Sequence, residues 1–249
     1  MRPRDRFFAD QNCEIRVSGN EAVVHDRLRS RYLRTSAEKL PDDVRGALQE
    51  RPERITLPAA AIFTATVIGG WLALLATTSI EVRPGVALIT GTGFVLVASI
   101  LVHEAAHVVV LRAFGKEVDH VGVKLNHWVF PALYVRMSQS IMLTRPEQVA
   151  VHLAGIAANV TTLSLVSVVN ALVWSSGTVT AAVHITVVLL GWNLLPLLGS
   201  DGYRVLLAFS GTAAARRIRS NPAWLNLIHL VSVMVAAATA AHLVLTLLG

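Results

Sequence analysis

Three ionisable side chains lie inside an apolar stretch of this sequence, LVHEAAHVVVL at residues 101–111. His103 and His107 are four residues apart, so on a helix both imidazoles project from one face and can reach the same metal ion. Glu104 lies beside them, where its carboxylate can act as a base on water without being a metal ligand. The H-E-x-x-H pattern therefore predicts one zinc ion per chain, with Glu104 as the catalytic residue.

A zinc ion held by two histidines needs a third protein ligand and an open coordination position. We expect this ligand to be Asp201, in GWNLLPLLGSDGYR, because the helix predicted before it returns to the side of the membrane where His107 lies. Pro196 and Gly199 would end that helix and let the carboxylate turn inward. The alternative is that Asp201 is an ordinary helix-end residue and that the ionisable side chains of 101–111 only pair with neighbouring helices. Inside a bilayer each of those side chains would then need a buried partner.

The composition indicates that these residues lie in a membrane domain. Hydrophobic residues make up 53% of the chain and charged residues 15%, and the mean hydropathy is +0.55. A helix needs about 20 apolar residues to cross a bilayer. We therefore predict an all-α polytopic membrane protein whose membrane domain covers 58–249. Its five spanning helices are expected at 58–80, 86–111, 148–173, 179–199 and 223–248.

The distribution of basic residues predicts how this domain is oriented. Of the 22 Lys and Arg residues, 12 lie in 1–57, 5 in 112–147 and 4 in 200–222, which are the segments on one side of five alternating spans. Lys and Arg are enriched in cytoplasmic loops. We therefore expect a cytoplasmic N-terminus, an outside C-terminus, and a site near the cytoplasmic face of a bacterial cell membrane. The net charge of +6 then orients the protein in its lipid bilayer and does not indicate a nucleic-acid partner.

Two segments outside the spans have the patterns of extended structure. In 1–57, EIRVSGNEAVVHD predicts a short strand pair with Gly19-Asn20 as its turn, and SAEKLPDDVRGALQE predicts a helix. The sequence leaves open whether 1–57 is a small cytosolic domain or a partly ordered tail. Residues 116–139 predict a β-hairpin at the cytoplasmic interface, with an irregular interfacial loop as the alternative.

The third predicted span has polar residues on one helical face. His152, Gly155 and Asn159 are three and four residues apart in HLAGIAANV, so they lie on the same side of a helix. Gly155 permits close helix approach, and Asn159 could bond a substrate backbone. Asn193 would direct a carboxamide into the same cavity. We predict that all four residues contribute to substrate binding, with ordinary helix packing as the alternative for His152 and Asn159.

Together these motifs resemble the site-2 protease family of intramembrane zinc metalloproteases. The resemblance rests on His103–His107, Gly155-x-x-x-Asn159, and Asn193-x-x-Pro196 followed by Asp201-Gly202, and it covers most of 58–222. It implies that the two histidines and the aspartate hold zinc and that the glutamate is the base. FPALYVRMS, PLL and Asp201-Gly202-Tyr203 are similar to one branch, the peptide zinc metalloproteases encoded with peptide-maturation and export systems.

That branch implies a ribosomally made peptide as substrate, a peptide exporter as partner, and a peptide-recognising role for 1–57. The chain departs from the family pattern at Ile156, where a proline is common, and at Tyr203, where a second glycine is common. Both departures concern the substrate side of the site more than the metal.

The sequence thus predicts a zinc metalloendopeptidase that hydrolyses a bond in a membrane-associated or precursor peptide. Two other classes of protein are compatible with the same residues. One is an inactive membrane scaffold or immunity protein that binds a peptide in the same cavity. The other is a small transporter whose intramembrane His, Glu and Asp conduct protons or metal ions.

Overall fold

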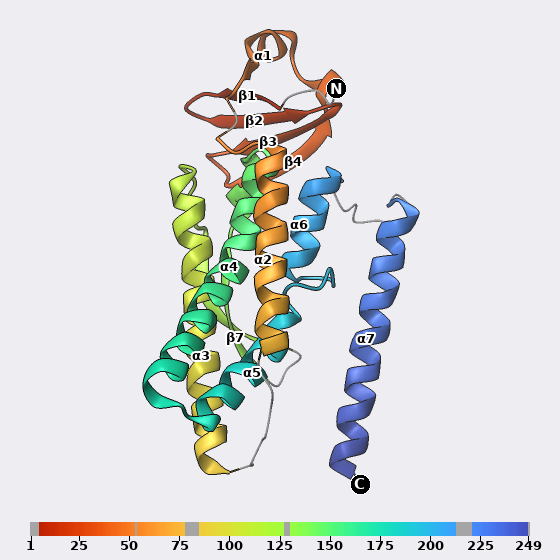
Figure 1. Ribbon diagram of the computed structural model, residues 1–249. Helices are drawn as coiled ribbons and strands as arrows, with labels where there is room; N and C mark the ends of the chain where they lie inside the picture. Colours follow the sequence, from red (N-terminus) through yellow and green to blue (C-terminus); the bar gives the residue numbers. More distant parts are fainter. Residues whose placement is uncertain (1–4, 53, 78–84, 127–129, 213–220, 249) are drawn as a thin grey trace.

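The computed structural model describes residues 5–52, 54–77, 85–126, 130–212 and 221–248 (Figure 1). Its N-terminal part has five strands, β1 to β5, at Arg6–Ala9, Cys13–Ser18, Glu21–Asp26, Arg31–Ser36 and Gln49–Glu50. They form one antiparallel sheet in the order β4-β3-β2-β1-β5, and a short helix, α1, covers Asp42–Ala47. The chain is mostly helical, but this part of it is a five-stranded sheet, of which the sequence predicted only one strand pair. The helices of the remaining chain dominate the composition and hide the signal of such short strands.

The predicted strand pair is confirmed as the β2–β3 hairpin. Its last facing residues are Ser18 and Glu21, and Gly19 has a φ of 61°, in the left-handed region that glycine adopts without a steric penalty. Alternate strand residues point to one side of the sheet. Ile15, Val17 and Ala22 are therefore all buried, together with Leu40. Residues 5–52 form a folded sheet with its own small core rather than a tail.

Six longer helices follow the sheet. Their bounds are Leu57–Thr77 (α2), Val86–Ala113 (α3), Arg145–Val169 (α4), Gly177–Gly191 (α5), Asp201–Ser210 (α6) and Ala223–Leu248 (α7). Within the described residues, three helical stretches are long and apolar enough to cross a membrane: Leu57–Ala76, Val86–Ala113 and Arg145–Trp174. The last stretch is α4 continued by a π-helical segment, Asn170–Trp174. These helices are compatible with a membrane protein.

The fourth predicted span, 179–199, is too long at its C-terminal end. α5 has only 15 residues and ends at Gly191, and a turn follows at 192–195. Pro196 keeps the chain from resuming a helix after this turn, because proline disfavours helical backbone in the residue before it and removes a hydrogen-bond donor. In α7, the part whose side chains are described, Ala223–Val235, is apolar but shorter than a span. Five spans therefore remain a prediction.

α4 is the central helix of the bundle, where it packs against α2, α3 and α6. The shared core includes Trp71 of α2, Leu153 and Ile156 of α4, and Val187 of α5. α7 lies at the outer side next to α6 (Figure 1). It is attached by hydrogen bonds from Tyr203 to His229 (Oη–Nε2 2.9 Å) and from the Leu198 amide to Ser232 (3.1 Å).

The predicted β-hairpin is confirmed between α3 and α4. Its strands are β6 (His120–Asn126) and β7 (Phe130–Arg136), which pair from His120–Arg136 to Asn126–Phe130. Residues 127–129 lie outside the described part of the chain. β7 packs along α3, so this strand lies beside the helix that carries the H-E-x-x-H pattern.

Charged side chains attach the N-terminal sheet to the helical domain. Arg16 of β2 is only 6% exposed, and it pairs with Asp5 at 2.8 Å while donating to the Ile141 carbonyl at 2.8 Å. Burial lowers the pKa of this guanidinium, and the Asp5 carboxylate acts in the opposite direction. Lys116, after α3, pairs with Glu14. The segments 1–57 and 112–147 thus meet at one end of the bundle.

Replacing Asp5 by asparagine should destabilise this junction. The variant leaves the guanidinium of Arg16 buried without its carboxylate, and breaking such a pair typically costs about 3 kcal/mol of unfolding free energy. Thermal unfolding of the detergent-purified chain checks the prediction. Asp42→Asn is the matched control, because the Asp42 side chain is 96% exposed and its surface pair with Arg45 should contribute little. Equal stability of the two variants would contradict the assigned role of Arg16.

Candidate metal centre

Three candidate ligand atoms from distant parts of the chain meet at one point. Asp201 Oδ2 lies 2.9 Å from His103 Nε2 and 3.3 Å from His107 Nε2, and the two Nε2 atoms are 3.1 Å apart. Both histidines project from α3 and are buried, while Asp201 is the first residue of α6. Among the residues that the structure describes, these three side chains are the ones placed closely enough to hold a metal ion together.

The spacing of these atoms fits zinc. Ligands at 2.0–2.1 Å from a tetrahedral zinc ion lie about 3.3 Å from one another, and the three distances here are 2.9, 3.1 and 3.3 Å. Two neutral imidazole nitrogens that face each other with their lone pairs repel unless a proton or a cation lies between them. Two imidazoles and one carboxylate are also a ligand set that zinc accepts in catalytic sites.

The far nitrogens of both imidazoles have partners that suit metal binding through Nε2. His107 Nδ1 lies 2.7 Å from the Val151 carbonyl oxygen, which accepts its proton. The carboxamide of Asn159 lies 3.1 Å from His103 Nδ1, and its Oδ1 is buried without a partner. A half-turn of the carboxamide directs Oδ1 to this nitrogen as an acceptor. Such partners fix the ring and its tautomer in metal sites.

Gly155 makes room for both rings. A Cβ atom at this position would lie 2.6 Å from atoms of His103 and of His107, which is closer than real contacts allow. The absence of a side chain therefore lets α4 approach the metal-binding face of α3. The sequence-based expectation of close helix approach at Gly155 agrees with this, although the contact is with the imidazoles rather than with a substrate.

Replacing Gly155 by alanine should displace the imidazoles and lower the zinc affinity by about 10- to 100-fold, the range found when supporting groups of a metal site are altered. Zinc per chain after dialysis against a zinc buffer measures the effect. Gly69→Ala in α2 is the matched control, because a Cβ atom there meets nothing within 4 Å. A Gly155→Ala protein that binds zinc as tightly as Gly69→Ala would refute the steric argument.

The loop before α6 fixes the position of Asp201. Ser200 caps the helix by accepting from the Tyr203 amide at 3.1 Å, and the Gly202 amide donates to the Asn193 carbonyl at 2.9 Å. Any side chain at Gly202 would collide with the Leu194 carbonyl. Asn193 therefore supports the aspartate through its backbone. Among the described residues its carboxamide has no hydrogen-bond partner, so a contact with substrate stays a prediction.

Glu104 lies beside the three ligands without joining them. It is half-buried on α3, within electrostatic range of His103, His107 and Asp201, and near the backbone of Val135 in β7, the strand that packs on α3. The hairpin therefore borders the side of the metal centre on which Glu104 lies. This is the arrangement expected of a base rather than a ligand.

Two predicted substrate-binding residues of α4 have other surroundings. Asn159 is only 1% exposed and its carboxamide contacts His103, so a contact between this carboxamide and a substrate backbone stays a prediction. His152 is buried near His107 and Asp201 but is not one of the three candidate metal ligands. Its surroundings include Arg204, a residue that the sequence analysis missed because no local pattern marks it.

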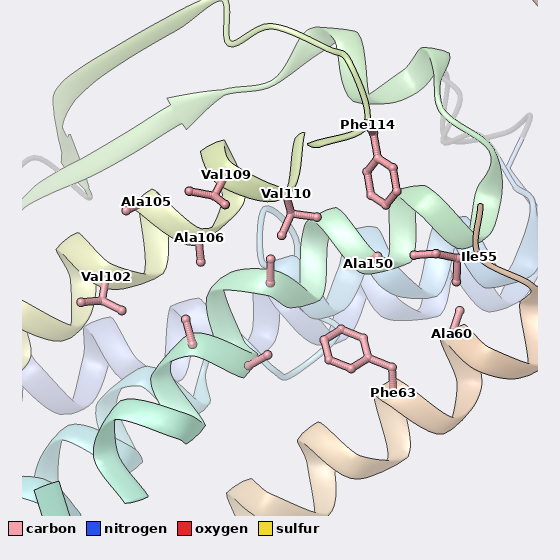
Figure 2. Close-up of a pocket in the computed structure, with 13 residues that line it drawn as sticks. Ile55, Ala60, Phe63, Val102, Ala105, Ala106, Val109, Val110, Phe114 and Ala150 are labelled. Atoms are coloured by element: carbon pink, nitrogen blue, oxygen red, sulfur yellow. The ribbon is translucent and has the colours of Figure 1, made fainter. Parts of the chain in front are cut away.

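A separate apolar cavity of about 630 Å³ lies between α2, α3 and α4 (Figure 2). On α3 it is lined by Val102, Ala106 and Val109, which flank the metal-binding face rather than form it. Its lining is aliphatic and aromatic, with Phe63 and Phe114 at its wall. It contains no group for metal or acid–base chemistry.

The comparisons with known proteins agree with a metalloprotease relationship. No protein-family profile and no solved structure matches the chain. A protein of Bacillus subtilis (strain 168), named "Putative peptide zinc metalloprotease protein YydH", is 38% identical over 150 residues. The matched region is 60% of this chain and 59% of the relative, so the chain spans less than two thirds of that protein. The chain is thus related in sequence to a protein named as a peptide zinc metalloprotease.

Proposed function

We propose that this protein is an intramembrane zinc metalloprotease of the site-2 protease type that hydrolyses a peptide bond of a membrane-associated or ribosomally made peptide. The observation that carries the proposal is the meeting of His103 Nε2, His107 Nε2 and Asp201 Oδ2 within 3.3 Å of one another, with Glu104 beside them. The relative named as a peptide zinc metalloprotease supports the same reaction class.

The residues of the chain divide the chemistry between them. His103, His107 and Asp201 would hold the zinc ion, which when bound supplies a Lewis acid that activates water and polarises the scissile carbonyl. Glu104 takes the proton from the attacking water and later passes it to the leaving amine. Val151 and Asn159 keep the imidazoles in the orientation that directs Nε2 to the metal.

The substrate must present an extended peptide bond to Glu104. A helical segment hides its peptide bonds in its own hydrogen bonds, so it has to be unwound locally. The β6–β7 hairpin borders the centre, and an edge of this hairpin could pair with the extended segment by β-augmentation. By this proposal the N-terminal sheet is cytosolic and binds the precursor peptide, and a peptide exporter takes up the product.

The proposal is tested with purified wild-type protein in detergent and a library of synthetic unstructured peptides. Mass spectrometry detects new peptide termini. We expect one zinc ion per chain, cleavage that 1,10-phenanthroline abolishes, and recovery when zinc is restored. Well-folded wild-type protein that binds no zinc would overturn the proposal and favour the peptide-binding scaffold.

A further inference from the structure

A polar cavity of about 250 Å³ separates the N-terminal sheet from α4 and α6. Its walls come from β2, β3 and β4, from the segment Ser138–Met142, and from the two helices. Four arginines line it: Arg16, Arg34, Arg145 and Arg204. Glu21 is the only carboxylate among the lining residues, so the cavity is strongly basic.

Two of the four arginines have carboxylate partners and two do not. Arg16 pairs with Asp5 at 2.8 Å, and Arg34 pairs with Glu21 at 3.3 Å. Arg145 donates to the Ser18 hydroxyl at 3.0 Å. Within the part of the chain that the structure describes, neither Arg145 nor Arg204 has a carboxylate within 4.0 Å. The cavity therefore has two positive charges that no described acidic residue balances.

The inner end of the cavity lies behind the candidate metal centre. His152 lines the cavity, is only 6% exposed, and its Nδ1 is buried without a hydrogen-bond partner. Its imidazole is also in electrostatic range of Arg204, Asp201 and His107. Arg204 itself is three residues after Asp201 on α6. Arg204, a residue of the cavity wall, thus lies about one helical turn from Asp201 along α6.

Arg145 lies against the end of α6. A side chain at Gly211, which has a φ of 64° and closes α6, would collide with the Arg145 guanidinium. The missing side chain at Gly211 leaves room for this guanidinium against the end of α6, and the bond to Ser18 fixes its orientation at the cavity wall. A planar, restricted guanidinium suits the recognition of a planar carboxylate.

We propose that this cavity binds a carboxylate group of the peptide substrate, either an acidic side chain or the C-terminus. Arg145 and Arg204 are the binding residues, and the buried His152 lies in the cavity wall with them. The proposal rests on the proposed function in taking the anion to belong to a peptide. A peptide is favoured over a lipid headgroup because one wall of the cavity is the N-terminal sheet rather than a membrane-spanning helix.

The test measures binding of a hexaglutamate peptide with a neutral fluorescent label to the zinc-loaded full chain in detergent. Arg204→Gln and Arg145→Gln should each weaken binding by about tenfold or more, as expected for the loss of a charged hydrogen bond. Arg204 is exposed on α6, so its variant should fold normally. Arg112→Gln is the matched control: it removes the same charge from an exposed residue outside the cavity.

Three results would overturn the proposal. One is equal binding by Arg204→Gln and wild type, and another is an equal loss in Arg112→Gln, which would indicate binding to the basic surface in general. The third is Arg204-dependent binding of inorganic phosphate or of phosphatidylglycerol nanodiscs without binding of hexaglutamate. Repeating the measurement with Glu104→Gln separates the carboxylate-binding proposal from the protease proposal. If this variant, which should lack proteolytic activity, still binds hexaglutamate in an Arg204-dependent way, the result supports carboxylate binding by the cavity and says nothing about proteolysis.

Discussion

Replacement of Asp201 by alanine should remove zinc from the purified protein. Asp201 is the only carboxylate among the three candidate ligands that the structure describes. Its Oδ2 atom lies within 3.3 Å of the Nε2 atoms of both histidines. Two histidines alone leave zinc one protein ligand short of a catalytic site. We expect the zinc affinity to fall by more than about 100-fold. Altering a group that only supports a ligand costs up to about 100-fold, and loss of the ligand itself should cost more.

Zinc per chain, measured by elemental analysis after gel filtration, checks this expectation. Asp42→Ala is the matched control, because Asp42 is also the first residue of a helix, but its side chain is exposed and is not among the three candidate ligands. The control should keep one zinc ion per chain. Asp201→Ala protein with full zinc would mean that another residue is the third ligand. Thermal unfolding of both variants separates loss of metal from loss of fold.

The residues of the candidate centre could be predicted because their chemistry is local. The spacing of His103 and His107 alone determines that their side chains share a helical face. Asp201 required one additional argument, namely that the helix before it returns to the same side of the membrane. That argument was sufficient even though α5 ends earlier than predicted, because the loop from 192 to 200 still brings Asp201 to α3.

The supporting contacts could not be predicted, since they depend on how α4 is rotated against α3. The same polar face of α4 is compatible with substrate binding and with contacts to imidazoles, and the sequence does not decide between them. In the structure Gly155 and Asn159 contact the imidazoles. The backbone carbonyl of Val151, which orients His107, has no side-chain signature at all.

Three of the five strands of the N-terminal sheet, and the basic cavity, escaped prediction for a related reason. Strands of two to six residues with mixed polar patterns give a weak signal, and only the β2–β3 pair has a recognisable glycine turn. The arginines of the cavity are at positions 16, 34, 145 and 204, so only the docking of the sheet onto α4 and α6 brings them together. Neither propensity nor spacing contains that information.

The Glu104→Gln protein should keep its zinc and lose its activity. Glutamine has nearly the same shape as glutamate, and Glu104 is not one of the three candidate metal ligands. We therefore expect one zinc ion per chain. Its carboxamide cannot take a proton from water, and removal of a general base typically costs a factor of about 100 to 10,000 in rate. The new peptide termini produced by wild type in the library assay should therefore fall below detection.

The outcome of this substitution separates the protease from the scaffold. A protease whose base is removed can still bind its substrate, so Glu104→Gln should co-purify with an uncleaved peptide that the wild type releases as fragments. A scaffold would bind the peptide at the metal centre without cleaving it, so wild type and variant would hold the same intact peptide. Undiminished cleavage by Glu104→Gln would instead assign the base to another residue. His152 could then be tested as the base by replacement with asparagine. Its imidazole lies near His107 and Asp201 and is not one of the three candidate ligands.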